Sequence, residues 1–114
     1  MEKTLFQKIA DKEIPSDMVY EDDLCVAFRD ITPVAPTHIL LVPRKPLRDV
    51  AAATPEDAAL LAHLLLKVGE IARAEGLTEK GFRTVINTGA DAGQTVPHLH
   101  LHIIGGRSMQ WPPG

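Results

Sequence analysis

The sequence predicts one α+β domain spanning residues 1–114: an antiparallel sheet of about five strands, with one long and one short helix on one face. Three observations lead to this prediction. Five short apolar segments with strand-like patterns are separated by turn residues. One segment alone has the length and periodicity of a long helix. The chain is also short enough for a single core, and no low-complexity linker divides it.

The first half of the chain supplies the short helix and three strands. Residues 4–10 are expected to be helical, because their apolar side chains share one side at helical spacing. Residues 18–22 and 24–29 are expected to form two strands around a tight turn. After a connection punctuated by prolines, residues 38–43 form a nearly continuous apolar strand.

The long helix is expected between Thr54, which suits an N-cap, and Gly76, which suits a C-terminal stop. Its apolar face is unusually wide, which predicts two burial partners: the protein's own sheet and a second subunit. The stripe left for solvent consists of His63, Lys67, Glu70 and Arg73. On this stripe we interpret His63 as a surface histidine without a catalytic role.

The second half of the chain ends in a strand pair, residues 81–87 and 98–103, joined by a loop that contains glycines. Strand side chains alternate between the two faces of a sheet. The expected inward set is Leu99, Leu101 and Ile103, and the expected opposite row is His98, His100 and His102. The tail, residues 107–114, is rich in proline, and its Trp111 is expected to dock near the site or at a dimer interface.

Composition limits the classes of partner and compartment. The net charge of -3 argues against a broad binding surface for nucleic acid or for an anionic membrane. The longest apolar run, residues 58–66, is interrupted by His63 and is too short to span a bilayer. The single Cys25 is interpreted as a small core residue, and one cysteine cannot form an internal disulfide. These observations predict a cytoplasmic protein.

The histidine row suits either a metal or a phosphoryl group. Zinc accepts neutral imidazole from such rows, but a straight strand spaces three side chains too widely for one ion. Metal-bound histidines also usually donate a hydrogen bond to a carboxylate, and Asp91 is the only acidic residue nearby in the sequence. Metal binding is therefore the second interpretation, and the prediction is a site without metal or cofactor.

An imidazole with one free nitrogen is a good nucleophile toward phosphorus, and its neighbours can move protons near neutral pH. The loop before the row adds what a phosphate needs. Gly89 and Gly93 allow backbone N–H groups to approach an anion, and Asn87 and Thr95 add donors. The row and the loop together favour phosphoryl chemistry.

Residues 94–104, Gln-Thr-Val-Pro-His-Leu-His-Leu-His-Ile-Ile, resemble the His-x-His-x-His-x-x signature of the histidine triad superfamily. The ending 105–114, Gly-Gly-Arg-Ser-Met-Gln-Trp-Pro-Pro-Gly, looks like the HINT branch, the histidine triad nucleotide-binding proteins. Further likeness lies in Phe6-x-Lys8-Ile9, in Ala27-Phe28-Arg29-Asp30-Ile31, in Ala35-Pro36-Thr37-His38 and in Asn87-Thr88-Gly89.

The resemblance implies a homodimer, joined through the long helix and an adjoining strand into one continuous ten-stranded sheet. It implies a purine nucleoside phosphoramidase that hydrolyses the P–N bond of adenosine 5′-phosphoramidates or nucleotidyl-lysine-type substrates, and that binds AMP or GMP. On this pattern His100 is the nucleophile and carries a nucleotidyl-histidine intermediate. His98 and His102 orient it, bind phosphate and assist proton transfer, while His38 supports His98.

The resemblance also assigns the rest of the site. Asp30 accepts the ribose hydroxyls, and the phosphate is held by Asn87, Gly93, Thr95 and Val96. The purine pocket is walled by Leu5, Phe6, Ile9, Ile14, Phe28, Ile31 and Leu40.

Two positions depart from the HINT pattern. Arg29 stands where a histidine is common, which affects the details of the base pocket. Thr95 stands where serine is common and is more familiar from the dinucleoside polyphosphate hydrolases of the same superfamily. That activity is the alternative within the enzyme class, and a nucleotide-binding scaffold dimer with little turnover is the alternative from another class.

Overall fold

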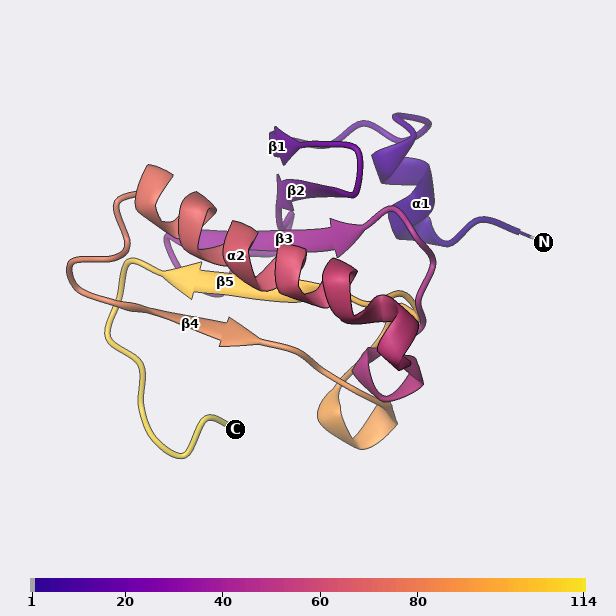
Figure 1. The fold of residues 1–114 in the computed structure, drawn as a ribbon. Coiled ribbons are helices and arrows are strands. Elements are labelled where there is room, and N and C mark those ends of the chain that lie inside the picture. Colours follow the sequence, from indigo (N-terminus) through magenta and orange to yellow (C-terminus); the bar gives the residue numbers. More distant parts are fainter. Residues whose placement is uncertain (1) are drawn as a thin grey trace.

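The computed structural model describes residues 2–114 and contains a five-stranded antiparallel sheet with one main helix (Figure 1). The strands are β1 (Met18–Glu21), β2 (Cys25–Arg29), β3 (Thr37–Pro43), β4 (Phe82–Val85) and β5 (Leu101–Gly105), in the order β1-β2-β3-β5-β4. The helices are α1 (Leu5–Ala10) and α2 (Ala58–Ala74), with single 3₁₀ turns η1 (Val50–Ala52), η2 (Pro55–Asp57) and η3 (Ala90–Ala92). The predicted fold class is confirmed.

The two helices lie on opposite faces of the sheet, not on one face as predicted. Helix α2 covers the face that carries Ile39, Leu41 and Leu101. Helix α1 packs Phe6 and Ile9 onto the other face, against Val26, Phe28, Leu40 and Val42. A six-residue helix covers only part of a sheet, so the rest of this second face is left for the histidine side chains.

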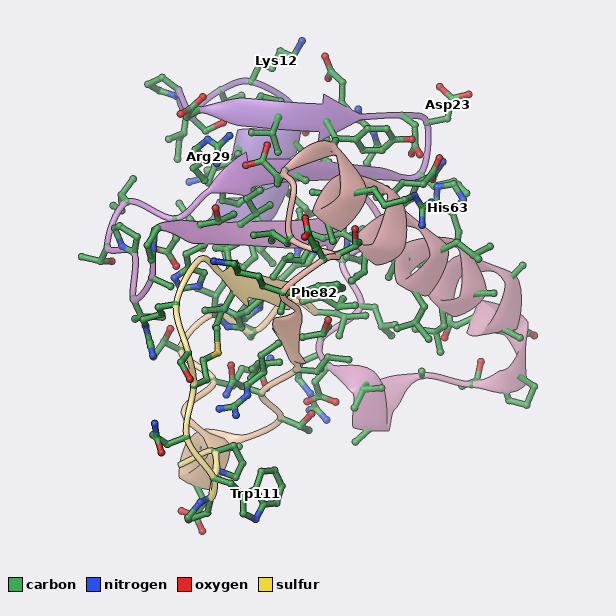
Figure 2. All side chains as sticks on the ribbon, turned by 90° about the vertical axis from the view of Figure 1, so that its left-hand side faces the viewer. Lys12, Asp23, Arg29, His63, Phe82 and Trp111 are labelled. Atoms are coloured by element: carbon green, nitrogen blue, oxygen red, sulfur yellow. The ribbon has the colours of Figure 1, made fainter. Side chains whose placement is uncertain are left out.

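Helix α2 buries part of its wide apolar face on the sheet. Leu64, Val68 and Ile71 are buried, whereas Leu65 is 60 % and Leu66 is 70 % exposed. On the stripe predicted to face solvent, Glu70 and Arg73 are exposed, but His63 and Lys67 are only partly exposed. His63 lies on the side of α2 that faces the β1–β2 turn, near Asp23 (Figure 2).

The histidine strand begins three residues later than predicted. Strand β5 starts at Leu101, because the Leu99 N–H donates to the Leu47 carbonyl instead of to a neighbouring strand. The alternation of faces persists all the same. Leu99 is 2 % exposed and joins the core under α2, whereas His98 and His100 contact Phe6 on the opposite face.

The tail returns beside β4. The Arg83 guanidinium donates to the Gln110 carbonyl at 2.9 Å, and the Arg107 Nε donates to the Val34 carbonyl at 3.0 Å. Trp111 itself is 83 % exposed and lies far from His63 in Figure 2. Docking of the tail onto a second copy stays a prediction. Within residues 2–114, no helix is long and apolar enough to cross a bilayer.

Candidate functional site

A cavity of about 380 Å³ opens between α1, the end of β2 and the histidine row. All seven predicted base-pocket residues line it, together with Asp30, Thr95, Val96, His100 and His102. Arg29, which was expected to affect the details of the base pocket, lines it too, and sequence reasoning missed three further lining residues, Pro15, Ser16 and Thr32. Pro15 and Ser16 gave no signal of their own, although they directly follow Ile14, which was predicted.

Four predicted site residues do not line this cavity: His38, His98, Asn87 and Gly93. The Asn87 Nδ2 donates to the Ala92 carbonyl at 2.7 Å, which fixes the loop that contains η3. Gly93 ends that turn with a φ of 81°, a left-handed conformation that favours glycine. Both residues shape the loop that leads to Thr95.

His100 presents a free ring nitrogen to the cavity. Its Nδ1 lies 2.7 Å from the His98 carbonyl oxygen. A carbonyl oxygen only accepts hydrogen bonds, so Nδ1 carries the hydrogen and Nε2 carries the lone pair. The Phe6 ring packs edge-on against the imidazole with centroids 4.9 Å apart, and His100 is 6 % exposed. The ring is therefore held in one orientation with its basic nitrogen available.

His98 is completely buried, and both of its ring nitrogens are engaged. Nε2 donates to the Pro43 carbonyl at 2.7 Å, and Nδ1 lies 2.6 Å from the Thr4 hydroxyl oxygen. Burial lowers the pKa of His98, which the bond to Pro43 only partly offsets. Neither ring nitrogen of His98 is therefore available to bind phosphate, which is the role that the resemblance implied for this residue. His98 contacts the site through its backbone carbonyl, which accepts the His100 Nδ1–H and so fixes the orientation of the His100 ring.

His38 supports His102 and not His98, which corrects the expectation from the resemblance. The ring atoms His38 Nε2 and His102 Nδ1 are 2.9 Å apart. The reason is the register of the sheet: Leu40 pairs with His102, so His38 lies two residues along the same strand face. Asp30 Oδ2 approaches His38 Nε2 at 3.5 Å.

The Val34 N–H, which begins this chain of contacts, determines which ring nitrogen of His38 and of His102 carries the hydrogen. The Val34 N–H donates to His38 Nδ1 at 3.2 Å, so the hydrogen of a neutral His38 is on Nε2. His38 Nε2 then donates to His102 Nδ1, which leaves the His102 hydrogen on Nε2. His102 thus offers an N–H group, and its ring centroid is 5.1 Å from that of His100. The cavity pairs a nucleophilic nitrogen with a donor.

Both supporting rings favour the neutral state. Burial lowers the pKa of His102 to about 4, reinforced by the charges of His100 and His38 and opposed by Asp30. Burial also lowers the pKa of His38, again opposed by Asp30. A neutral pair keeps the donor–acceptor direction described above at ordinary pH.

Two groups of residues in the described part of the chain bring three metal-type donor atoms within 4.8 Å of one another. One is Asp30, His38 and His102, in which the two imidazoles already bond to each other. The other is Asp22, Cys25 and His63. His98 turns toward Pro43 and is part of neither group. The prediction of a site without metal stays a prediction.

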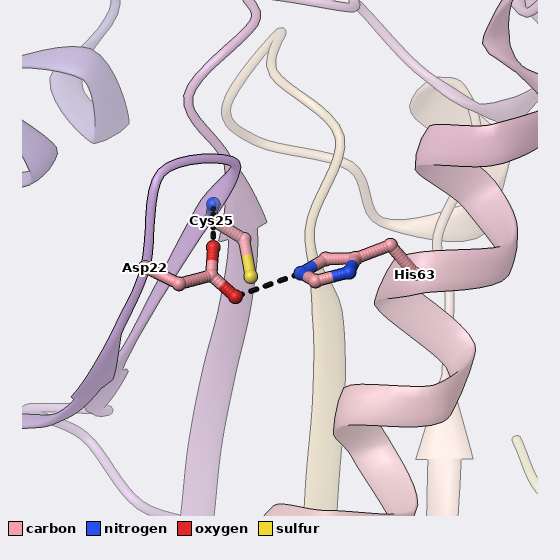
Figure 3. Close-up of side chains that lie close together, drawn as sticks. All are labelled: Asp22, Cys25 and His63. Carbon is pink, nitrogen blue, oxygen red and sulfur yellow. Dashed lines mark hydrogen bonds and ion pairs between the residues drawn. The ribbon is translucent and has the colours of Figure 1, made fainter.

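Figure 3 shows the second group, which joins α2 to the β1–β2 turn. His63 Nε2 lies 2.7 Å from Asp22 Oδ2, which also accepts from the Tyr20 hydroxyl. Asp22 Oδ1 accepts the backbone N–H groups of Leu24 and Cys25. Burial acts to raise the pKa of Asp22, but these hydrogen bonds outweigh it and hold the pKa far below its usual value. His63 therefore has a structural contact that its place on the helix did not predict.

Cys25 is fully buried beside Asp22. Burial, with the negative charge of Asp22, raises the pKa of the thiol to about 12. A neutral buried thiol packs as a small apolar side chain, as predicted.

The sheet, the cavity and the paired imidazoles define a histidine-centred α+β domain with a ligand pocket on the sheet face opposite its long helix. The HIT domain family matches residues 11–109, so the chain belongs to that family. An uncharacterized HIT-like protein of Synechococcus elongatus is 62 % identical over 113 residues, which is 99 % of this chain and 98 % of that protein.

Solved structures agree with this assignment. A HIT family hydrolase from Legionella pneumophila is 48 % identical, with a TM-score of 0.96 over 98 % of this chain and all of that chain. A histidine triad nucleotide-binding protein from Candida albicans is 29 % identical, with a TM-score of 0.82 over 96 % of this chain and 83 % of that chain. The branch within the family stays a prediction.

Proposed function

We propose that this protein is a hydrolase of purine nucleoside phosphoramidates that works through a nucleotidyl-histidine intermediate on His100. The observation that carries the proposal is that two ring nitrogens of different character face one cavity: one offers a lone pair and the other offers a hydrogen. His100 Nε2 has a lone pair because its Nδ1 bonds to the His98 carbonyl, and His102 Nε2 has a hydrogen because its Nδ1 accepts from His38. The Legionella protein, which is called a HIT family hydrolase, has the same fold.

The reaction has two steps. In the first, His100 Nε2 forms a bond to the α-phosphorus as the bond from phosphorus to the amine nitrogen breaks. The leaving nitrogen takes up one proton from solvent, so the amine departs neutral, and the His102 N–H stabilises the negative charge on the phosphoryl oxygens. In the second, water attacks the phosphorus and gives up a proton to solvent, the bond to His100 breaks, and the nucleoside monophosphate is released with the imidazole restored.

The rest of the cavity suits a purine nucleoside. Its apolar wall, which includes Phe6, Ile9 and Phe28, offers area for a flat base. The Asp30 Oδ1 already accepts from Thr32, so the ribose hydroxyls are assigned to its Oδ2. Thr95 and Val96 lie where the phosphate would meet the end of the loop. Asn87 and Gly93 are assigned to shaping that loop.

The test compares wild type with His100→Ala on an adenosine 5′-phosphoramidate, with release of AMP as the readout. Loss of a nucleophile is expected to lower kcat by about a thousandfold or more, while AMP still binds. A peptide that contains His100 and carries one nucleotidyl group, trapped in acid-free digests of the wild type, would support the intermediate. Full hydrolysis by His100→Ala would refute the proposal.

The same assay separates the alternatives. A higher kcat/KM for a diadenosine polyphosphate than for the phosphoramidate would assign the chain to the dinucleoside polyphosphate hydrolases. Nucleotide binding with negligible turnover on both substrates would favour a scaffold. Activity that survives EDTA treatment is expected, because no step proposed here uses a metal.

We also propose that the working unit is a cytoplasmic homodimer. Exposed apolar side chains support the dimer: Val50, Leu65 and Ile86 line an apolar hollow of about 120 Å³, and Leu66, the next residue along α2, is exposed as well. Strand β4 is also an edge of the sheet and could pair with its copy. Sedimentation velocity of Leu65→Glu should show a shift toward monomer, and Leu24→Glu, at an exposed leucine of the β1–β2 turn, is the matched control.

A further inference from the structure

Helix α1 reaches the histidine row through its N-cap, Thr4. The Thr4 Oγ1 accepts the Gln7 N–H at 3.0 Å. The same Oγ1 lies 2.6 Å from His98 Nδ1, ninety-four positions away in the chain. The Pro43 carbonyl near His98 Nε2 can only accept, so the hydrogen of a neutral His98 is on Nε2 and the Thr4 hydroxyl donates to Nδ1.

The His98 ring is thus held at both nitrogens. The Pro43 carbonyl accepts the Nε2–H at 2.7 Å and fixes the tautomer, and the Thr4 hydroxyl donates to Nδ1. With the ring held at both nitrogens in a fully buried position, the His98 backbone is fixed as well. Its carbonyl oxygen accepts the His100 Nδ1–H at 2.7 Å, which leaves His100 Nε2 free for attack.

From this chain of contacts we propose that Thr4 is a positioning residue: its hydroxyl holds the His98 ring at Nδ1 and, through the His98 carbonyl, the orientation of His100. The effect that we expect on kcat rests on the proposed function, whereas the effect on His98 itself does not. Thr4 does not line the cavity, so it acts on His100 only through His98. The N-cap of α1 therefore helps to orient the nucleophilic ring of His100.

The kinetic test uses Thr4→Val, which removes the hydroxyl and keeps the shape of the side chain. We expect kcat on an adenosine phosphoramidate to fall by about 10- to 100-fold, with KM nearly unchanged, because a small misplacement of a nucleophile has effects of that size. Thr4→Ser, which keeps the hydroxyl, should retain most of the activity.

Gln7→Ala is the matched control for helix capping. The Gln7 side chain accepts the Thr4 N–H at 2.8 Å, so this variant weakens the cap but leaves the Gln7 N–H and the bond from Thr4 to His98 intact. Its kcat should stay within about twofold of wild type. Equal losses of kcat in Thr4→Val and Gln7→Ala would overturn the proposal, because capping alone would then explain both. Thr4→Gly, which also caps well, replaces Thr4→Val if that variant does not fold.

A second readout does not depend on activity. Ring ¹⁵N chemical shifts of His98 report which nitrogen carries the hydrogen and whether the other nitrogen accepts a hydrogen bond. We expect the Nε2–H tautomer in all four proteins, because the Pro43 carbonyl accepts that hydrogen in each, and a shifted Nδ1 resonance in Thr4→Val alone, because only that variant loses the hydroxyl that donates to Nδ1. An Nδ1 resonance in Thr4→Val that matches wild type would overturn the positioning role even if kcat falls. A wild type that is inactive on phosphoramidates but shows these shifts would refute the proposed function and support the role of Thr4.

Discussion

Mild acid should destabilise this protein through His102. Its pKa is lowered from 6.5 to about 4 by burial and by the charges of neighbouring histidines. In the unfolded chain the same imidazole takes up a proton near its ordinary pKa. The unfolded state therefore binds more protons than the folded state between these two values, and linkage requires stability to fall as the pH drops through that window.

The size of the effect follows from the two pKa values. One pKa unit corresponds to about 1.4 kcal/mol, so the full shift is worth about 3 kcal/mol once the pH is below about 4. At about pH 7 almost none of this loss has occurred, because both states are then largely neutral. At about pH 5 the loss reaches about 2 kcal/mol. A small domain has a total stability of only about 5–15 kcal/mol, so such a change is easily measured.

The assay is equilibrium unfolding in urea at several pH values for wild type and His102→Gln, in which position 102 no longer titrates. Other groups titrate in both proteins and largely cancel in the difference. We expect the free energy of unfolding of wild type, relative to the variant, to fall by about 2 kcal/mol between about pH 7 and about pH 5. A difference that stays constant over this range would refute the assignment of a neutral, buried His102.

Three further predictions concern stability, each measured by urea or thermal unfolding. Asp22→Ala should cost about 2–3 kcal/mol, because four hydrogen bonds lose their acceptor, whereas His63→Ala should cost only about 1 kcal/mol; equal costs would contradict this account of the β1–β2 turn. Gly69→Ala should stabilise helix α2 by about 0.5–1 kcal/mol, since the new Cβ meets its nearest atom at an ordinary 3.6 Å. Gly105→Ala should cost about 1–3 kcal/mol, because its Cβ would lie 2.8 Å from a methyl carbon of the buried Leu77, and a stabilised variant would show that this contact relaxes freely.

Local patterns in the sequence were sufficient for the elements of the fold. The alternation around His100 and the apolar run before Pro43 predicted the two central strands, and Thr54 and Gly76 marked the region of the long helix within a few residues. The resemblance also named every lining residue of the cavity except Pro15, Ser16 and Thr32, with Arg29 named as a departure from the family pattern.

Contacts between distant segments could not be predicted in this way. The partner of His38 depends on the register between β3 and β5: a slip of one residue would turn His38 to the opposite face, and a slip of two would bring it to another position of the histidine row. The bond of Thr4 to His98 and that of His63 to Asp22 join residues 94 and 41 positions apart, and no periodicity reports either of them. Which apolar residues of α2 face the sheet, and which stay exposed as Leu65 does, likewise depends on how the helix packs.

The cavity has a consequence for charge. The one cationic side chain among the residues that line it, Arg29, binds Glu75 through two hydrogen bonds of 2.8 and 3.1 Å, and burial lowers the pKa of His102, which favours its neutral form. In the proposed function, an anion in this pocket is therefore held mainly by dipoles, and Asp30 repels it weakly. The phosphoramidate substrate of that proposal carries one negative charge, whereas the released monophosphate carries nearly two near neutral pH. On this proposal the pocket favours departure of the product, and substrate binding should depend only weakly on salt concentration.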